Sequence, residues 1–481
     1  MNLGAVALFG VLAIPLAAAA LLAAFPSYRL SARLNTVAAG LSFLSALVLI
    51  GERPAASDFL LVDDVNIVFI VLNTFIGFTT AVFSASYIRH ELETGRLTPV
   101  FLRFYHAMYQ FMLFGMSLAL AAQNVGVMWV AVELATLTTV VMVGIYRTHE
   151  AIEAAWKYFI LGSVGIALAL FGTILVYLAA QPVIGAGLPA MSWIQLVAHA
   201  HRFDPALLNL AFIFLLLGYG TKVGLAPLHA WLPDAHAEGP TPISAVLSGL
   251  LLNVALYAVM RFKVVMTANA DAIAPGPLMV LMGLTSVIFA GFMLYRRRDI
   301  KRLFAYSSIE HMGIIAFAFG MGGPLANFAG LLYMAMHSLT KSAIFFAVGH
   351  VAQAKGSQKL EDMGGLTVTH PALGWGLVLG VVAIAGMPPM GVFMSEFLVV
   401  SSTFARNPLL AIPLVFGLLV AFGALVLQLQ HVAFGEPKGE SHKVQAAYLP
   451  LMAHLALVLV AGVYLPPPIV AWFQNVARAL G

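Results

Sequence analysis

The sequence predicts an all-α polytopic membrane protein with about fourteen transmembrane helices. Of its 481 residues, 61% are hydrophobic and only 9% are charged, whereas a soluble domain has about 25% charged residues. The apolar runs are continuous and about 20 residues long, the length that a helix needs to cross a bilayer, and not the alternating tracts of about 10 residues of a β-barrel. They recur to the last part of the chain, which excludes an ordinary soluble enzyme.

The expected spans are delimited by turn residues and by the few charges between apolar runs. They cover residues 3–25, 33–50, 64–88, 101–122, 125–146, 155–180, 206–237, 241–263, 276–295, 302–322, 325–352, 371–404, 408–434 and 446–464. The seventh and twelfth spans are too long for simple helices, and they contain Pro227 and the pair Pro388 and Pro389, respectively. Because proline removes a backbone donor and clashes with the preceding turn, we expect both helices to be broken.

The order of the spans suggests four segments. These are an N-terminal three-helix segment (1–100), two five-helix units (101–265 and 276–434), and a final helix with a short tail (446–481). The two broken helices are five spans apart, an odd number, so the second unit is expected to repeat the first in inverted orientation. Inverted repeats with discontinuous helices mark ion or substrate sites near the bilayer midplane. The alternative is that the prolines are ordinary kinks, which transmembrane helices tolerate.

The basic residues predict the orientation of the chain. Loops after odd-numbered spans hold fifteen of the 24 Lys and Arg residues, the opposite loops hold six, and three lie inside spans. Because cytoplasmic loops carry the excess of Lys and Arg, the odd-numbered loops are expected in the cytoplasm. Both termini are then expected on the periplasmic side of the cell inner (plasma) membrane.

Ionisable residues inside the predicted spans are the candidates for function, because each costs on the order of 3 kcal/mol to insert into the bilayer. Glu133 lies in the fifth span, Lys222 precedes the Pro227 break, Lys341 is central in the eleventh span, and Glu396 follows the second break. We expect these four to take part in a proton relay, and structural ion pairing is the alternative for them.

Further ionisable residues lie in or near the spans. Glu310 and His311 are in the tenth span and His229 follows the first break. Lys157 is near the start of the sixth span, where its side chain can extend to the cytoplasmic surface. For isolated histidines such as His106 and His454, we expect a hydrogen-bonded packing role instead.

The chemistry of such groups favours protons as the transported ion. Burial favours the neutral form of a lysine, and a nearby carboxylate favours its charged form. Changing the distance between the two therefore makes the lysine release or take up a proton. Broken helices expose backbone groups to which water can bind, so a hydrated chain of Glu, Lys and His side chains would carry protons through the apolar interior.

Several other functions are excluded or disfavoured. The sequence has no cysteine, which excludes disulfides, cysteine-ligated iron–sulfur clusters and thiol catalysis. We expect no cofactor, no metal and no redox catalysis by this chain itself. The absence of a long basic run argues against binding to nucleic acid. A membrane haem or quinone oxidoreductase is disfavoured because no clear pair of histidines occupies haem-ligating positions.

Two long motifs carry a resemblance to a known family. Residues 221–241, TKVGLAPLHAWLPDAHAEGPT, resemble the broken-helix signature of the antiporter-like subunits of respiratory complex I, and residues 299–313, DIKRLFAYSSIEHMG, resemble a second block of that family. Glu310 before His311, together with the overall length, is most similar to the antiporter-like component of hydrogenase-4. That type belongs to membrane-bound group 4 nickel–iron hydrogenases and formate hydrogenlyases.

The resemblance implies roles for individual residues. Glu133 matches the glutamate of the family's fifth helix, and Lys222 matches the presumed proton acceptor of its seventh helix, which is paired with that glutamate. Glu396 matches the terminal residue of its twelfth helix. His337 and Lys341 resemble the eleventh-helix pair of one subunit type. With His311, these residues form the expected relay.

Secondary relay positions include His229, Glu310 and Lys157, and one position departs from the family. Many relatives have a lysine in the eighth span where this sequence has Asn253. Asparagine can hydrogen-bond water but cannot carry a proton charge, so the centre of the relay is expected to run through water, or through His311 and Lys341.

The resemblance also implies partners. The chain would lie in the lipid bilayer beside other membrane and hydrophilic subunits of a complex I-like or hydrogenase complex, and those subunits would transfer the electrons. The alternative is a subunit of a multisubunit sodium/proton antiporter, which ion gradients drive without redox coupling.

Overall fold

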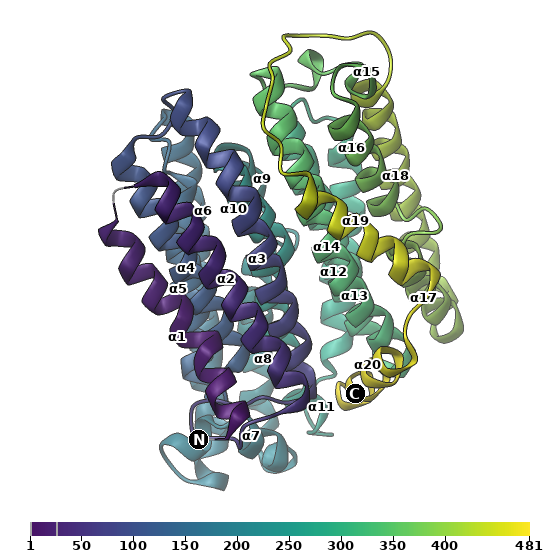
Figure 1. Cartoon of the computed structure of the whole chain (residues 1–481). Helices are drawn as coiled ribbons and strands as arrows, with labels where there is room; N and C mark the ends of the chain where they lie inside the picture. The colour runs from purple at the N-terminus through teal and green to yellow at the C-terminus, as the bar shows by residue number, and fades with distance from the viewer. Residues whose placement is uncertain (1, 26) are drawn as a thin grey trace.

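The computed structural model describes residues 2–25 and 27–481 and shows a bundle of helices joined by loops (Figure 1). Within these residues there is no β-strand, and the only β pairing is four isolated bridges. The prediction of an all-α polytopic membrane protein is therefore confirmed.

Nearly all helices correspond to predicted spans. They are α1 (Leu3–Ala24), α2 (Tyr28–Gly51), α3 (Asp64–Glu93), α4 (Pro99–Ala121), α5 (Val125–Val143), α6 (His149–Ile184), α8 (Pro205–Val223), α9 (Trp231–Glu238), α10 (Thr241–Val246), α11 (Leu252–Thr267), α12 (Pro275–Leu294), α13 (Ile300–Met321), α14 (Gly323–Lys355), α16 (Pro371–Ile384), α17 (Gly391–Arg406), α18 (Pro408–Ala433) and α19 (Tyr448–Val463). A π-helical turn, Leu247–Leu251, joins α10 to α11. Three helices lie outside the predicted spans: α7 (Trp193–His199), α15 (Leu366–Thr369) and α20 (Pro467–Ala479).

Eleven of these helical stretches are long and apolar enough to cross a membrane, or up to twelve if α19 and α20, which meet at 82°, form one span. The two remaining predicted spans are α4, which contains His106 and Gln110, and the pair α16 and α17, whose halves are short. Helix boundaries differ from the prediction by a few residues. For example, α6 begins at His149 because the side chain of Thr148 accepts a hydrogen bond from the backbone N–H of Ala151 and caps the helix.

Both expected breaks are present. The first break, residues 224–230, begins at Gly224, whose φ of +78° is left-handed and ends α8. The backbone N–H of Ala226 donates to the Ser286 hydroxyl at 2.8 Å, and the indole N–H of Trp231 donates to the Thr221 carbonyl at 2.8 Å. These bonds satisfy backbone groups that the broken helix leaves free. The second break, residues 385–390, separates α16 from α17 and contains Pro388 and Pro389.

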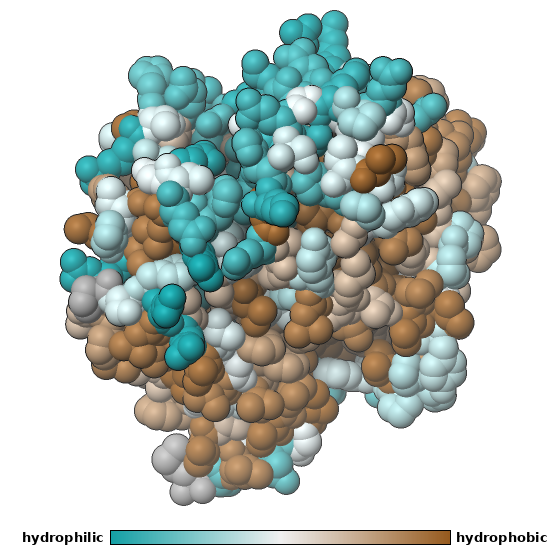
Figure 2. All heavy atoms as spheres, turned by 45° about the horizontal axis from the view of Figure 1, so that its top comes forward, coloured by the Kyte–Doolittle hydropathy of each residue, from teal (hydrophilic) through white to brown (hydrophobic). Residues whose placement is uncertain are grey.

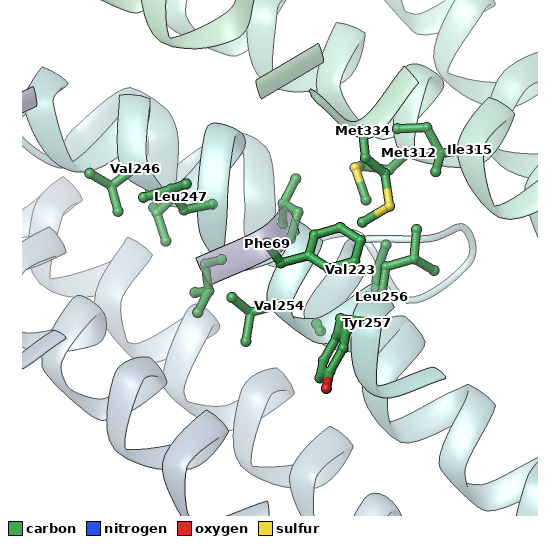
Figure 3. Close-up of a cluster of buried hydrophobic side chains, with 14 of the residues drawn as sticks. Phe69, Val223, Val246, Leu247, Val254, Leu256, Tyr257, Met312, Ile315 and Met334 are labelled. Atoms are coloured by element: carbon green, nitrogen blue, oxygen red, sulfur yellow. The ribbon is translucent and has the colours of Figure 1, made fainter. Parts of the chain in front are cut away.

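The helices of the two halves lie side by side, with the early helices on one side of the bundle and α12–α19 on the other (Figure 1). Helix α4 packs on α5 and α6 on α8 in the first half, and α12 packs on α13 and α14 on α16 and α17 in the second. Helices α11, α13 and α14 are almost entirely buried. Figure 3 shows one apolar cluster between them, with Phe69, Val254, Tyr257, Met312 and Met334.

Polar residues gather at one end of the molecule. Figure 2 shows a hydrophilic surface over the end that lies at the top of Figure 1, with apolar residues below it. Both termini lie toward the opposite end (Figure 1), as an even number of spans requires. Three lysines at or just outside the ends of predicted spans are buried, namely Lys263, Lys301 and Lys355. Each donates hydrogen bonds to backbone carbonyls, because an ammonium group removed from water needs acceptors.

Candidate functional site

The first cluster of ionisable groups lies at the first break, where α5 meets α8. Lys222 Nζ lies 3.1 Å from Glu133 Oε2, and the Lys222 side chain is 1% exposed, whereas that of Glu133 is 17% exposed. Gly162 of α6 leaves room for the ammonium group, because a Cβ atom at this position would lie 3.1 Å from Nζ. The two predicted residues therefore form an ion pair in which the lysine is buried and the glutamate is partly exposed.

Aromatic residues hold the end of α8 that carries Lys222. The ring of Tyr158 stacks on that of Trp231 with 4.2 Å between centroids, and the Trp231 indole donates to the carbonyl of Thr221, directly before the lysine. The Tyr158 hydroxyl lies 2.8 Å from the Thr139 hydroxyl of α5. The backbone around Lys222 is thus tied to α5, α6 and α9.

The second cluster lies beside the second break and contains a hydrogen-bonded chain of three side chains. The Tyr333 hydroxyl of α14 donates to Glu396 Oε1 of α17 at 2.7 Å, and its oxygen lies 2.7 Å from His311 Nδ1 of α13. Since the hydroxyl hydrogen goes to the carboxylate, His311 donates from Nδ1. One continuous hydrogen-bonded chain of side chains therefore joins three helices.

Tyr333 is a member of this chain that the sequence interpretation missed. A signal was present, because Tyr333, His337 and Lys341 follow one another at four-residue intervals, a spacing that places side chains on one face of a helix. Residue type alone pointed to the histidine and the lysine, since a tyrosine in a membrane span is not unusual by itself.

The remaining groups of the second cluster are fully buried. Lys341 Nζ donates to the carbonyl of Phe304 at 3.0 Å. The ring centroids of His311 and His337 are 5.8 Å apart, and Glu310 Oε2 lies 3.2 Å from His311 Nε2 without the geometry of a hydrogen bond.

Several polar atoms of this cluster have no hydrogen-bond partner among the described residues, namely Glu310 Oε2, His311 Nε2 and both ring nitrogens of His337. Buried polar groups are almost always hydrogen-bonded to protein or to ordered water. The cluster is therefore chemically suited to hold water next to groups that exchange protons.

The second break positions the Glu396 carboxylate. Gly386 in this break has a φ of +65°, a conformation that favours glycine. A Cβ atom at Gly386 would collide with the Glu396 carboxylate. The break thus lets the carboxylate approach the backbone closely.

Not all predicted relay residues lie in the buried clusters. Lys157 is 47% exposed and pairs with Glu153 at 2.6 Å and with Asp234 at 3.0 Å. Asp234 also pairs with Arg302, which pairs with Glu238. Lys157 therefore belongs to a surface ion network that links α6, α9 and α13, apart from the buried groups.

The other secondary positions are buried in the core. His229 follows Pro227 in the first break, and its ring lies 4.6 Å from that of Phe289. Asn253 of α11 donates to the Ser338 hydroxyl of α14 at 2.5 Å. The structure thus connects the Asn253 position to the helix that carries His337.

The structure bears differently on the two histidines for which a hydrogen-bonded packing role was expected. His454 is hydrogen-bonded to Thr79 and to the Leu339 carbonyl. The hydrogen-bonded role expected for His106 is wrong, since neither of its ring nitrogens has a partner among the described residues.

Two further buried groups lie at α9. The ring nitrogens of His236 in α9 are buried without a partner in the part of the chain that the structure covers. Close by, the buried Lys301 donates to the carbonyls of Ala237 and Gly239 at 2.9 and 2.6 Å and caps α9.

Potential metal ligands do not cluster in the part of the chain that the structure describes. Across residues 2–25 and 27–481, no group of three or more His, Asp or Glu side chains is arranged to hold a metal ion. The side chains of the two clusters are Glu, His, Lys and Tyr, and each of these types can give or take a proton.

Comparisons with known proteins agree with this geometry. Residues 122–421 match the family model of the NADH:quinone oxidoreductase/Mrp antiporter transmembrane region. The chain is 63% identical over 475 residues to the Hydrogenase-4 component F homolog of Methylacidiphilum infernorum, with 99% of each chain covered.

Two solved structures share the fold. A chain of the membrane-bound sulfane sulfur reductase, an archaeal respiratory membrane complex, matches with a TM-score of 0.87 and 23% identity, covering 99% of this chain and 97% of that one. A chain of the Mrp complex from Dietzia sp. matches with a TM-score of 0.82 and 17% identity, covering 100% and 97%. The chain therefore belongs to the NADH:quinone oxidoreductase/Mrp antiporter family of membrane proteins.

Proposed function

We propose that the chain is the proton-translocating, antiporter-like membrane subunit of a membrane-bound hydrogenase or a related complex I-like redox complex. One observation carries this proposal: two clusters of buried ionisable groups each lie beside a broken helix, one around Glu133 and Lys222 and one around Glu396. Structural ion pairing alone does not account for Lys341 of the second cluster, which donates to a backbone carbonyl and has no carboxylate of the described residues within ion-pair distance.

In the proposed cycle, the Glu133–Lys222 pair sets the charge of the lysine. A carboxylate at 3.1 Å stabilises the ammonium form. When the carboxylate moves away, the lysine loses this stabilisation and releases its proton toward the interior of the chain. Lys341, His337 and His311 then pass the proton on through water, and Tyr333 delivers it to Glu396. His229 and Glu310 are secondary positions of this relay.

The two halves of the bundle have a similar arrangement of helices, and each half contains one broken helix. We propose that residues 101–265 and 276–434 are two inverted five-helix units, preceded by the three-helix segment 1–100 and followed by residues 446–481. Corresponding helix pairs pack on each other in both halves, and each unit then contains one break.

The partners and the location follow from the same proposal. A relative with 63% identity is called a hydrogenase-4 component, which supports the proposal that the chain lies beside other membrane subunits and beside hydrophilic subunits that transfer electrons. The distribution of basic residues supports the cell inner membrane with both termini on the periplasmic side. No redox step is assigned to this chain itself.

The second candidate is a multisubunit sodium/proton antiporter without redox coupling. The fold shared with the Mrp complex chain favours it, but the identity to that chain is only 17%. The two proposals differ in the driving force and in the neighbouring subunits.

The test is to purify the native complex, identify the co-purifying subunits, and reconstitute the complex in liposomes. Hydrogenase subunits and an acidification that requires electron flow, measured with a pH-sensitive dye, are expected. Small antiporter subunits, with ²²Na⁺ flux driven by a pH gradient alone, would favour the second candidate.

A further inference from the structure

A small cavity lies between α3 and α11, away from both clusters of charges. Its volume is about 10 Å³, and its lining consists of Asn73, Asn253 and five apolar residues, among them Phe69 and Val254. Figure 3 shows Phe69 and Val254 at this contact between the helices. Asn73 and Asn253 are 2% and 3% exposed, so both amide groups are buried.

The amide nitrogens of both asparagines are bonded outside the cavity. Asn73 Nδ2 donates to the Ser117 hydroxyl at 3.1 Å. Asn253 Nδ2 donates to Ser338 at 2.5 Å, with the Met334 and Gly249 carbonyls at 3.4 Å. Because carbonyl oxygens only accept hydrogen bonds, these contacts set the orientation of the Asn253 amide.

The amide oxygens, in contrast, have no partner. Asn73 Oδ1 and Asn253 Oδ1 are buried acceptors without any donor among the described residues. Both residues line the same small cavity, and the five other lining residues are apolar. The cavity therefore presents two acceptors and lacks a side-chain donor.

We propose that Asn73 and Asn253 bind one water molecule in this cavity, which donates one hydrogen to each amide oxygen. The volume matches the roughly 10–15 Å³ that a buried water requires. A ligand with a single hydrogen would leave one acceptor unpaired, and an anion would face two oxygen dipoles. A water molecule satisfies both groups.

This site deepens the proposed function and rests on it for its role in transport. The water joins Ser117 and Asn73 to Asn253 and Ser338, and Ser338 lies next to His337 in α14. The lining offers this water no group that gives or takes a proton, because an amide side chain cannot carry a proton charge and the other five residues are apolar. The water therefore acts by positioning: it holds Asn73 of α3 to Asn253 of α11, whose amide in turn bonds Ser338 of α14, the helix that carries His337.

The direct test is a high-resolution cryo-EM map of the intact complex. Density within hydrogen-bond distance of both amide oxygens is expected in the wild type, and its loss is expected in Asn73→Leu and in Asn253→Leu, where an apolar side chain of similar size replaces the amide. An empty cavity in a wild-type map that resolves other buried waters would overturn the proposal.

The role in transport is tested with the reconstituted complex. Each single variant is expected to slow the initial acidification rate several-fold, and the double variant no further, because all three lack the same water. Thr74→Val is the matched control, since the Thr74 hydroxyl bonds carbonyls of its own helix. A wild-type acidification rate in either single variant, or additive losses of rate in the double variant, would refute the role of this water in transport.

The failure of this inference differs from the failure of the proposed function. If Lys222→Ala stops transport while the asparagine variants transport normally, only the role of the water is wrong. If the wild-type complex moves no protons, the proposed function is wrong, and the map alone decides whether the water is bound.

Discussion

The two clusters stabilise buried ionisable groups by different contacts. At the first break, Lys222 and Glu133 face each other directly at 3.1 Å, and one partner is partly exposed. At the second break, a neutral hydroxyl connects His311 to Glu396, and Lys341 binds a backbone carbonyl. In an ion pair, the distance between the carboxylate and the lysine decides whether the lysine keeps its proton. In a hydrogen-bonded chain, a proton can pass from one group to the next. Under the proposed function, we expect the first break to act as a switch and the second to provide the conducting path.

The largest effect is expected from Lys222→Ala, which removes the ammonium group of the proposed switch. Acidification by the reconstituted complex should fall to the level of protein-free vesicles, while the subunits still co-purify. The control is Lys157→Ala, since Lys157 lies in the exposed network and a surface ion pair contributes little. Wild-type acidification by the Lys222→Ala complex would show that this lysine is structural.

Glu133→Gln tests whether the switch depends on charge or on hydrogen bonding. The amide still accepts a hydrogen bond from the lysine but no longer stabilises its charged form. We expect the rate of acidification to fall by about tenfold or more, since a buried charge that loses its partner is strongly destabilised. A rate close to that of the wild type would mean that the pair acts only through its hydrogen bond.

Tyr333→Phe tests the conducting path at the second break. The variant keeps the ring but removes the hydroxyl between His311 and Glu396. We expect transport to slow by about fivefold, which corresponds to a lost hydrogen bond of about 1 kcal/mol. Tyr333→His should restore part of the rate, because imidazole also relays a proton, whereas a merely structural hydroxyl would not be replaced in this way.

A matched control for the Tyr333 variant is Tyr109→Phe. Tyr109 is also fully buried, and its hydroxyl donates to the Gly77 carbonyl of α3. An equal loss of transport in both variants would indicate a general packing defect and would contradict a specific role for Tyr333.

The smallest effect is expected from Gly162→Ala, which crowds the switch without changing its charges. The added methyl group would lie 3.1 Å from Lys222 Nζ, so the flexible end of the lysine must shift slightly. We expect a reduction of about twofold in transport with the complex intact, as for mild overpacking. Unchanged transport would show that the ammonium group has room to move.

Much of the fold was predictable because the bilayer imposes it. The absence of water in the membrane requires long apolar helices, and prolines in two overlong spans predicted both breaks. The cost of burying charge singled out Glu133, Lys222, Lys341 and Glu396 before any contact was known.

Other features of the site were not predictable from residue type and position along the chain. Tyr333 is part of the path only because α13 and α17 bring His311 and Glu396 to its hydroxyl. Lys301 follows a loop in the sequence but is buried under the end of α9. A lysine near a helix end is either exposed or buried depending on which other helix covers it, and the sequence pattern does not contain that information.

By itself, the sequence determined the membrane-embedded helical fold, the two breaks and the short set of buried charges, because each depends on local hydrophobicity, backbone chemistry or the cost of desolvation. The family resemblance implied that Glu133 pairs with Lys222, but only the tertiary structure gave the 3.1 Å distance between them and decided which other groups meet. It placed Lys157 at the surface and joined His311 to Glu396 through Tyr333. Hydrogen bonds and ion pairs require atoms within a few ångströms, and the packing of helices distant in sequence sets those distances.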